Sequence, residues 1–231
     1  MKKILLMAFT VSVMLGACKK DDDSPKEEVC TKVSSYSASY YYSPNTHVNN
    51  ISYDNQDRIS KVAWSNSSLT YTYSANSITE DLDDSGYMEQ TVYTLDSQNR
   101  IVRAVRGTEL DVSYFYNAEG YLSELKDGSE TKAFVWQNGN MVEGDGITYS
   151  YYNEAVPQSY LITAYGANSI YLNSYLYNYF GKISKNLIKT ESIGQNTTNY
   201  QYEKDTQGRV TKITSINGGN KDTYAISYSC N

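Results

Sequence analysis

A short polar segment recurs along this chain and constrains its fold more than any single residue does. Each copy places Asp, Asn or Gln in a polar turn and follows it, a few residues later, with an apolar residue. The five copies cover Tyr53–Ile59, Leu95–Ile101, Tyr116–Leu122, Trp136–Met141 and Lys204–Val210. Arg58 and Arg100 are 42 positions apart and Arg100 and Tyr121 are 21 apart, so the period is about 21 residues. A period of this length indicates one supersecondary unit used repeatedly.

Each copy has the chemistry of a turn that leads into a strand. The Asp or Asn side chain bonds to its own backbone, and a Gly or Asn supplies the left-handed position. Alternating runs such as Leu69–Tyr73 and Leu110–Tyr116 lie between the turns, which predicts two strands per repeat. The chain is therefore predicted to be all-β, an antiparallel meander of repeated hairpins. Because closure removes exposed edge strands, we expect a strongly curved or closed, barrel-like sheet.

One stretch departs from this pattern. Between Ile170 and Ile183, apolar and aromatic residues recur at helical spacing, and Gly181 interrupts them. This pattern predicts one short helix or irregular plug near residues 170–186, packed on the sheet. No low-complexity linker divides the chain after residue 30, so residues 30–231 are predicted to form a single β-meander domain.

The N-terminus predicts export and lipid attachment. Lys2 and Lys3 precede an apolar run that ends in Leu-Gly-Ala-Cys at Cys18, which is typical of a secretory signal. The last four residues resemble the lipobox of bacterial lipoproteins. That resemblance implies a signal peptide over residues 1–17, cleavage before Cys18 and acylation of Cys18.

Residues 18–29 are predicted to be a disordered acidic tether behind the lipid, because they contain almost nothing apolar to bury. The block Lys19–Asp23 resembles the export signal of Bacteroidota surface lipoproteins. That resemblance implies a lipid-anchored protein on the outside of the outer membrane, and a generic solvated spacer is the alternative.

The net charge of the chain limits the classes of partner that it is expected to bind. The signal segment carries two lysines and no acidic residue, so its removal changes the net charge from −6 to −8. An acidic chain without clustered Lys and Arg is not expected to bind nucleic acid. The predicted partners are the membrane, through the lipid anchor, and a glycan or protein ligand.

The remaining two cysteines, Cys30 and Cys230, lie near the two ends of the predicted domain. In an oxidising compartment an even pair suggests a disulfide. Two free structural thiols are the alternative.

Tyrosine dominates the aromatic residues, with 25 copies against 4 Phe and 2 Trp. Ordinary strand packing explains such a bias, since Tyr favours strands and keeps a polar tip. The alternative is an exposed aromatic face that binds a glycan or a protein. The candidate residues for such a face are Trp64, Trp136, Tyr71, Tyr73, Tyr149 and Tyr151.

The repeats support two resemblances. The turn segments look like degenerate YD repeats of Rhs-type shell proteins, in which such repeats build a wrapped β-sheet. Together with the lipobox, the segments Gly181–Ile188, Tyr202–Val210 and Tyr228–Cys230 are similar to an uncharacterised lipoprotein family of gut Bacteroidota (domain of unknown function 4595). That family is described as porin-like, which implies a fold and a location but no activity. Since both strand faces carry polar residues, as in Ser35–Tyr40, we do not expect a membrane pore.

Catalytic and metal-binding patterns are sparse. His47 is the only histidine, which argues against a histidine-dependent triad or a multi-histidine zinc site. The segment 81–89 offers oxygen ligands at calcium-loop spacing, from Asp81, Asp83, Ser85 and Glu89. Position 12 of that loop is Val92 where a Glu belongs, so an acidic hairpin turn is the favoured interpretation. No cofactor is predicted.

These observations predict a non-catalytic binding module displayed on the outer membrane, with a glycan or protein ligand. A structural envelope protein without a small ligand is the first alternative. The second is a carboxylate-dependent glycoside hydrolase, for which the sequence selects no pair of acids.

Overall fold

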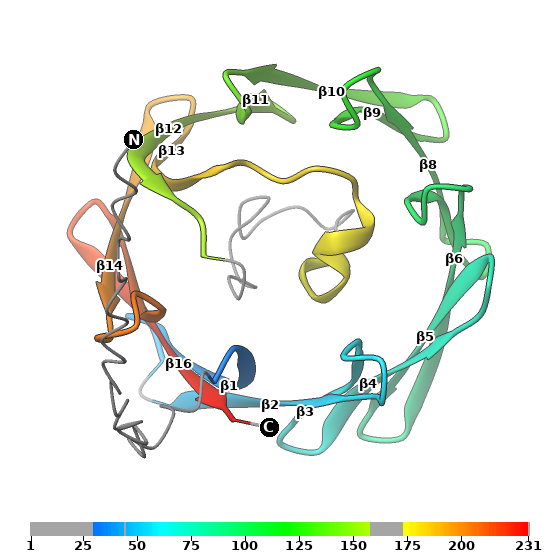
Figure 1. Cartoon of the computed structure of the whole chain (residues 1–231), viewed down its shortest axis with the longest axis horizontal. Coiled ribbons are helices and arrows are strands. Elements are labelled where there is room, and N and C mark those ends of the chain that lie inside the picture. The colour runs from blue at the N-terminus through cyan, green and yellow to red at the C-terminus, as the bar shows by residue number, and fades with distance from the viewer. Residues whose placement is uncertain (1–29, 44, 158–172, 231) are drawn as a thin grey trace, which may run out of the picture.

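The chain folds into one closed ring of antiparallel strands. The computed structural model describes residues 30–43, 45–157 and 173–230. The sixteen strands pair with their sequence neighbours, and β1 pairs with β16 to close the barrel (Figure 1). The all-β antiparallel meander predicted from the repeats is therefore confirmed, and its sheet is closed.

The strands are short and even in length. Their bounds are β1 (Lys32–Ser39), β2 (Thr46–Tyr53), β3 (Ile59–Trp64), β4 (Ser67–Tyr73), β5 (Ser77–Asp84), β6 (Tyr87–Leu95), β7 (Ile101–Arg106), β8 (Leu110–Tyr116), β9 (Leu122–Asp127), β10 (Glu130–Gln137), β11 (Asn140–Gly144), β12 (Ile147–Ala155), β13 (Asn186–Ile193), β14 (Asn196–Lys204), β15 (Val210–Asn217) and β16 (Asn220–Ser229).

Two kinds of turn occupy the two ends of the barrel. In a meander every second turn lies at the same end, so the repeat turns 54–58, 96–100, 117–121 and 205–209 share one rim. We call it the Asp-turn rim. The opposite end, the tight-turn rim, carries the turns inside the hairpins, such as residues 65–66, 85–86 and 145–146. The ends of β1 and β16 that carry Cys30 and Cys230 also lie at the Asp-turn rim.

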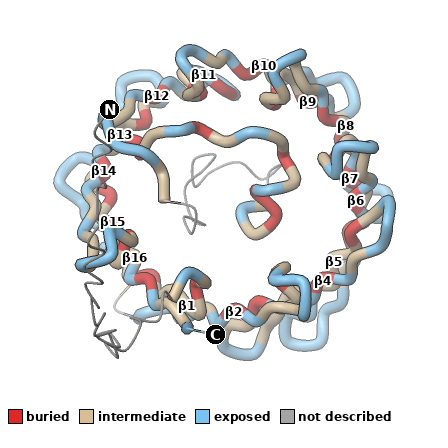
Figure 2. The backbone as a smooth tube through the Cα atoms, in the orientation of Figure 1, coloured by how far each residue is buried: buried red, intermediate tan, exposed pale blue. Residues whose placement is uncertain are grey.

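Strand alternation sorts the side chains between the two faces. Buried residues recur all around the ring, and exposed residues gather in the turns (Figure 2). The core consists of aliphatic and tyrosine side chains on the inner wall, among them Val62, Ile78, Ile101 and Ile213, each fully buried.

A connecting segment between β12 and β13 enters the ring, as Figure 1 shows. Its described part, residues 173–185, is here called the plug. It contains one short 3-10 helix, η1 (Ser174–Tyr179). Asn173 caps η1 by accepting a hydrogen bond from the Tyr175 backbone N–H at 2.9 Å. The short helix or irregular plug predicted near residues 170–186 thus describes this segment, and residues 170–172 of that prediction lie outside the described residues.

The plug is fastened at the Asp-turn rim and packed into the core. The backbone N–H of Lys182 donates to the Gly120 carbonyl at 2.9 Å, and that of Lys185 donates to the Gly139 carbonyl at 3.0 Å. Leu176 and Phe180 are fully buried. The plug therefore fills part of the barrel interior as a piece of the core.

Candidate functional site

The repeat turns form a recurring three-residue unit at the Asp-turn rim. In the turn 96–100, one oxygen of Asp96 accepts from the backbone N–H groups of Gln98 and Arg100, each at 2.9 Å. The other oxygen contacts Arg100 Nε at 2.8 Å and Nη2 at 2.7 Å. The Arg100 guanidinium then lies over the ring of Tyr116 at 4.3 Å, a cation–π contact.

The same unit recurs twice, with small changes of partner. Its other copies are Asp54–Arg58–Tyr73 and Asp205–Arg209–Tyr228. In the turn 117–121, Asn117 makes both backbone bonds, and Tyr121 takes the place of Arg and stacks on Trp136 at 4.4 Å. The Asp and Asn turns predicted from the repeats are confirmed, and their arginines bind the turn aspartates.

The pKa values of the turn aspartates report these contacts. Partial burial alone would raise the pKa of Asp96, but the backbone and side-chain hydrogen bonds from Arg100 outweigh it and lower that pKa. The pKa values of Asp54 and Asp205 are lowered in the same way. These carboxylates are therefore held ionised by the turn itself.

A second contact repeats in seven of the eight hairpins. An aromatic side chain near the end of the second strand donates a hydrogen bond to the carbonyl of a buried apolar residue at the start of the first strand. The pairs are Tyr53–Val33, Tyr73–Ile59, Tyr116–Ile101, Trp136–Leu122, Tyr151–Met141, Tyr202–Ile188 and Tyr228–Val210. The β5–β6 hairpin has Leu95 at the end of its second strand and makes no such bond. Six of the 25 tyrosines therefore serve to satisfy carbonyls of the strand ends.

The six aromatic candidates lie inside the barrel rather than on an exposed face. Tyr73, Tyr151 and Trp136 make the carbonyl bonds just described. Tyr71 and Tyr149 are buried on the inner wall, and Trp64 packs, half-buried, against the core. The structure therefore has no exposed aromatic face made of these six residues. One of them, Tyr73, lines a cavity inside the barrel that is described next.

The larger cavity, of about 360 Å³, opens between the plug and the inner wall at the Asp-turn rim. We call it the rim cavity. Five tyrosines line it, three of them from η1: Tyr53, Tyr73, Tyr175, Tyr177 and Tyr179. Charged and polar groups of the rim complete the lining, among them Lys32, Asp57, Arg58 and Asn99. The cavity thus combines aromatic walls with a polar mouth.

The smaller cavity, of about 280 Å³, lies on the other side of the plug. We call it the inner cavity. Its lining includes Glu80 from β5, Arg106 from the end of β7, Leu110 from the start of β8 and Asn173 from the plug. Because Arg106 and Leu110 flank the tight turn of the β7–β8 hairpin, this cavity lies toward the tight-turn rim.

Tyr175 separates the two cavities. It lines both of them, and its hydroxyl lies 2.6 Å from the hydroxyl of Tyr36 on β1. Burial raises the pKa of Tyr175 far above its ordinary value, and the neighbouring Tyr36 raises it further. Tyr175 is therefore a neutral hydrogen-bonding partition over the whole physiological pH range.

A buried carboxyl, Glu80, anchors the plug. The Asn173 side-chain amide donates to one Glu80 oxygen, and the hydroxyl of Tyr93 donates to the other at 3.4 Å. The same amide donates to the Tyr71 hydroxyl at 3.1 Å. Burial raises the pKa of Glu80, although its hydrogen bonds from Tyr71, Tyr93 and Asn173 oppose that shift.

The opposite wall repeats this arrangement. Across three adjacent strands, Tyr71, Glu80 and Thr91 stand in register on β4, β5 and β6. Eight strands further around the ring, Tyr149, Glu191 and Thr198 stand in the same register on β12, β13 and β14. Tyr200 donates to Glu191 at 2.9 Å, as Tyr93 does to Glu80. The two acids lie on opposite walls of the barrel, not side by side across one cleft.

Segment 81–89 forms the β5–β6 hairpin turn that the sequence favoured over a calcium loop. Alternation along β5 and β6 points Asp81 and Asp83 outward, whereas Glu89 lies on the inner wall and accepts from Arg106 at 3.0 Å. Asp81 accepts from Gln90 at 2.8 Å, and Asp83 accepts from the Gly86 backbone N–H at 3.1 Å. Ser85 holds the turn with φ +55°. Among the described residues no three His, Cys, Asp or Glu side chains form a group able to hold a metal ion.

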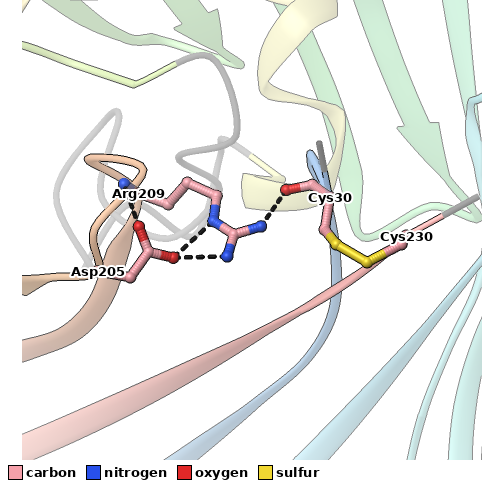
Figure 3. The surroundings of a disulfide bond; sticks show 4 residues. All are labelled: Cys30, Asp205, Arg209 and Cys230. Carbon is pink, nitrogen blue, oxygen red and sulfur yellow. Dashed lines mark hydrogen bonds and ion pairs between the residues drawn. A yellow bond between two sulfur atoms is a disulfide. The ribbon is translucent and has the colours of Figure 1, made fainter. Parts of the chain in front are cut away.

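The structure joins Cys30 and Cys230 in a disulfide across the β1–β16 closure (Figure 3). Arg209 of the nearby repeat turn donates to the Cys30 carbonyl while it binds Asp205. Covalent and ionic contacts therefore meet where the ring closes. The lipidation candidate Cys18, the signal segment 1–17 and the tether 18–29 lie outside the described residues.

The outer wall carries paired ionised side chains. Arg103 and Asp111 pair at 2.6 Å between β7 and β8, and Lys212 and Glu203 pair at 2.8 Å between β15 and β14. The described residues contain no helix long and apolar enough to span a membrane.

Comparison with known proteins provides information about the fold of this chain. No protein family and no curated protein matches this chain. Among solved structures, the chain is similar to a porin-like protein from Bacteroides uniformis ATCC 8492, with a TM-score of 0.64 and 14% sequence identity. The match covers 87% of this chain and 98% of that one. At this identity the likeness shows the fold alone, which confirms the expected porin-like fold. Membership of the Bacteroidota lipoprotein family and the likeness to YD repeats stay predictions.

Glu80, Arg106 and Asn173 escaped the sequence analysis. Glu80 stands two residues after Ile78, and Arg106 two residues after Ala104, so both share the face of a buried apolar residue. A charged residue on the same strand face as a buried apolar residue is the sequence signal that would have identified Glu80 and Arg106. Asn173 had no comparable signal, because its role depends on where the plug enters.

Proposed function

We propose that this protein is a lipid-anchored envelope protein that works as a non-catalytic binding module, with a glycan as its ligand. The rim cavity carries this proposal. Tyrosine rings present flat apolar faces for the C–H groups of a sugar, and their hydroxyls supply polar tips. Lys32, Asp57 and Arg58 at the mouth add charged hydrogen-bonding groups. A glycan uses both kinds of contact at once.

The proposed location rests on separate observations. The Cys18 lipobox supports a lipid anchor, and the porin-like fold of the neighbour fits an envelope protein. Ion pairs such as Arg103–Asp111 on the outer wall fit a barrel surrounded by water, because a barrel embedded in lipid presents an apolar band outward. We therefore place the barrel outside the hydrocarbon layer, held there by the lipid on Cys18.

The arrangement of acids favours binding over hydrolysis. Glycosidases hold two carboxyls about 5–9.5 Å apart on either side of the bond they cleave. Glu80 and Glu191 stand eight strands apart in a ring of sixteen, each bonded to its own tyrosine. A hydrolase would need a different pair.

The test is a glycan array with the mature chain carrying Cys18→Ser, which keeps the protein free of lipid. Hits are then titrated by calorimetry against Tyr179→Ala and Tyr87→Ala. Tyr179 lines the rim cavity, whereas Tyr87 is 61% exposed at the tight-turn rim. We expect Tyr179→Ala to weaken binding at least tenfold and Tyr87→Ala to leave it unchanged.

Two results would overturn the proposal. One is an array without any bound glycan, which would favour a structural envelope protein. The other is a glycan whose affinity does not respond to Tyr179→Ala in a variant that keeps the melting temperature of the parent. Release of free sugar during the titration would instead revive the hydrolase.

A further inference from the structure

Arg106 differs from every other arginine of the chain. The chain has five, and four of them direct Nε and Nη2 at an aspartate carboxylate. These pairs are Arg58–Asp54, Arg100–Asp96, Arg103–Asp111 and Arg209–Asp205. In each pair the two nitrogens on the same edge of the guanidinium meet one carboxylate, at both oxygens in Arg103–Asp111 and at Oδ2 alone in the other three. The arrangement with both oxygens is the strong, planar mode of carboxylate binding.

No carboxylate of the described residues bonds to that edge of Arg106, although Glu80 lines the same cavity. The Nη1 of Arg106 donates to Glu89 at 3.0 Å, which is the only hydrogen bond of this side chain to the described residues. Its Nε is buried without an acceptor. Buried donors without acceptors are rare in folded proteins because they lose their hydrogen bond to water and gain nothing in return. The guanidinium lines the inner cavity with unused hydrogen-bonding capacity.

We infer that the inner cavity is a binding site for a small carboxylate, held by Arg106. The ligand carboxylate meets Nη2 in the cavity, and a rotation of the guanidinium plane brings Nε into the same two-point contact that the other four arginines make. The site lies beyond Tyr175 from the rim cavity and takes a different chemical class, so it stands independently of the proposed glycan site.

The rest of the cavity restricts what the carboxylate is attached to. Glu80 and the Asn173 amide present hydrogen-bonding groups on the side of the plug, and Thr91 adds a buried hydroxyl group. Leu69, Ala104 and Leu110 give the cavity an apolar wall. With a volume of about 280 Å³, it suits a small molecule whose far end carries hydroxyl or ammonium groups. Acidic monosaccharides and free amino acids both have this chemistry.

Calorimetric titration of the mature Cys18→Ser chain with three probes tests this inference. D-glucuronate and L-alanine carry the carboxylate, and D-glucose is the neutral match to the first. We expect at least one carboxylate to bind at least tenfold more tightly than glucose. Binding of glucuronate alone identifies an acidic sugar site, and binding of alanine alone identifies an amino acid site. Failure of both carboxylates would overturn the inference.

Two arginines of the same strand provide the matched variants. Arg106→Lys keeps the charge but loses the planar two-point contact, so it is expected to weaken carboxylate binding at least tenfold. Arg103→Lys makes the same change on the outer wall of β7 and is expected to leave binding unchanged. Equal loss in both variants would indicate non-specific charge attraction and contradict the proposed site.

A further variant tests the inner cavity independently, in case Arg106→Lys does not fold. Leu110→Trp fills the inner cavity without altering Arg106, and it too is expected to abolish carboxylate binding. Tyr179→Ala, in the rim cavity, should leave that binding intact. If Leu110→Trp binds the carboxylate as the parent does, the ligand lies elsewhere and the inference is wrong. The rim-cavity proposal is judged separately by its own glycan titration.

Discussion

The two rims of this barrel are built from the same sixteen strands, yet their turns are held by different means. At the tight-turn rim, two residues close each of several hairpins mainly with backbone conformation, as at Ser85 (φ +55°) and Gly86 (φ +94°), where one side-chain bond from Gly86 N–H to Asp83 is added. At the Asp-turn rim, three five-residue turns depend on an aspartate, an arginine and a tyrosine from a further strand. The first kind of turn closes one hairpin, and the second kind ties one hairpin to the next.

That difference explains why the rims carry different features. A two-residue turn matched to the twist of the strands leaves no room for insertions. The Asp-turn rim holds the chain ends, the disulfide and the attachment of the plug. The lumen and its rim cavity are therefore shaped from one end of the barrel. Variants at one rim can therefore be compared with matched variants at the other.

The largest effect is expected from opening the ring where it closes. The double variant Cys30→Ser, Cys230→Ser removes a link over 200 positions. In the chain-entropy model such a link contributes about 5 kcal/mol to the free energy of unfolding. Guanidinium unfolding of the variant and of the reduced parent should show the same loss. Agreement with the oxidised parent to within about 1 kcal/mol would mean that β1–β16 pairing closes the ring unaided.

Removing one aspartate from each rim separates side-chain turns from backbone turns. Asp96→Ala deletes two backbone bonds and the Arg100 pair, so we expect a loss of about 2–3 kcal/mol. Asp83→Ala, at the tight-turn rim, deletes one bond to Gly86 and should cost less than about 1 kcal/mol. Urea unfolding measures both. Equal losses would contradict the division between the rims.

Glycines at the two rims provide a second comparison. At Gly181, φ is +78° and an added Cβ would lie 2.5 Å from the Gly120 carbonyl oxygen, so Gly181→Ala should cost about 2 kcal/mol or more. Gly107, with φ +53°, has nothing within 4 Å of the added Cβ. Gly107→Ala should therefore cost only the backbone strain of about 1 kcal/mol. Thermal unfolding of the two variants checks the order, and a reversed order would contradict the plug attachment.

A smaller effect is expected from one hydroxyl. Tyr116→Phe leaves the Ile101 carbonyl without its donor at 2.6 Å and should cost about 1–2 kcal/mol. Tyr87→Phe, exposed at the tight-turn rim, should not change the unfolding midpoint. If Tyr116→Phe also leaves the unfolding midpoint unchanged, the recurring aromatic-to-carbonyl bond contributes little to stability.

Acid should weaken the Asp-turn rim selectively. Since the folded pKa values of Asp54, Asp96 and Asp205 are lowered, their contribution is present above the unfolded pKa of about 4 and is lost as pH falls through the folded values. The melting temperature should therefore drop below about pH 4, and Asp96→Asn should reduce the slope of that drop. An unchanged slope would show that other groups control the acid transition. The raised pKa of Glu80 works in the opposite direction, because its contribution is lost as pH rises.

The local units of this fold were predictable because their causes are local. Asp96 bonds to backbone groups two and four residues away, so the turn is encoded within one repeat. The alternation in Leu110–Tyr116 is likewise a property of seven adjacent residues. The alternative inference from the tyrosine bias, an exposed aromatic face, was wrong for Tyr71 and Tyr149, which are buried as ordinary strand packing predicts. Tyr71 and Tyr149 looked suited to an open face, whereas closure of the sheet turned that face into the inside of a barrel.

By itself, the sequence determined that this chain forms antiparallel hairpins linked by Asp and Asn turns, because hydrogen bonds between near neighbours dictate those elements. Only the tertiary structure decided that the ring closes with sixteen strands, that the plug enters it, that Glu80 meets Asn173, and that the Nε of Arg106 is buried without an acceptor. Those contacts join residues up to 200 positions apart, and the curvature of the whole sheet sets them. No local pattern carries that information.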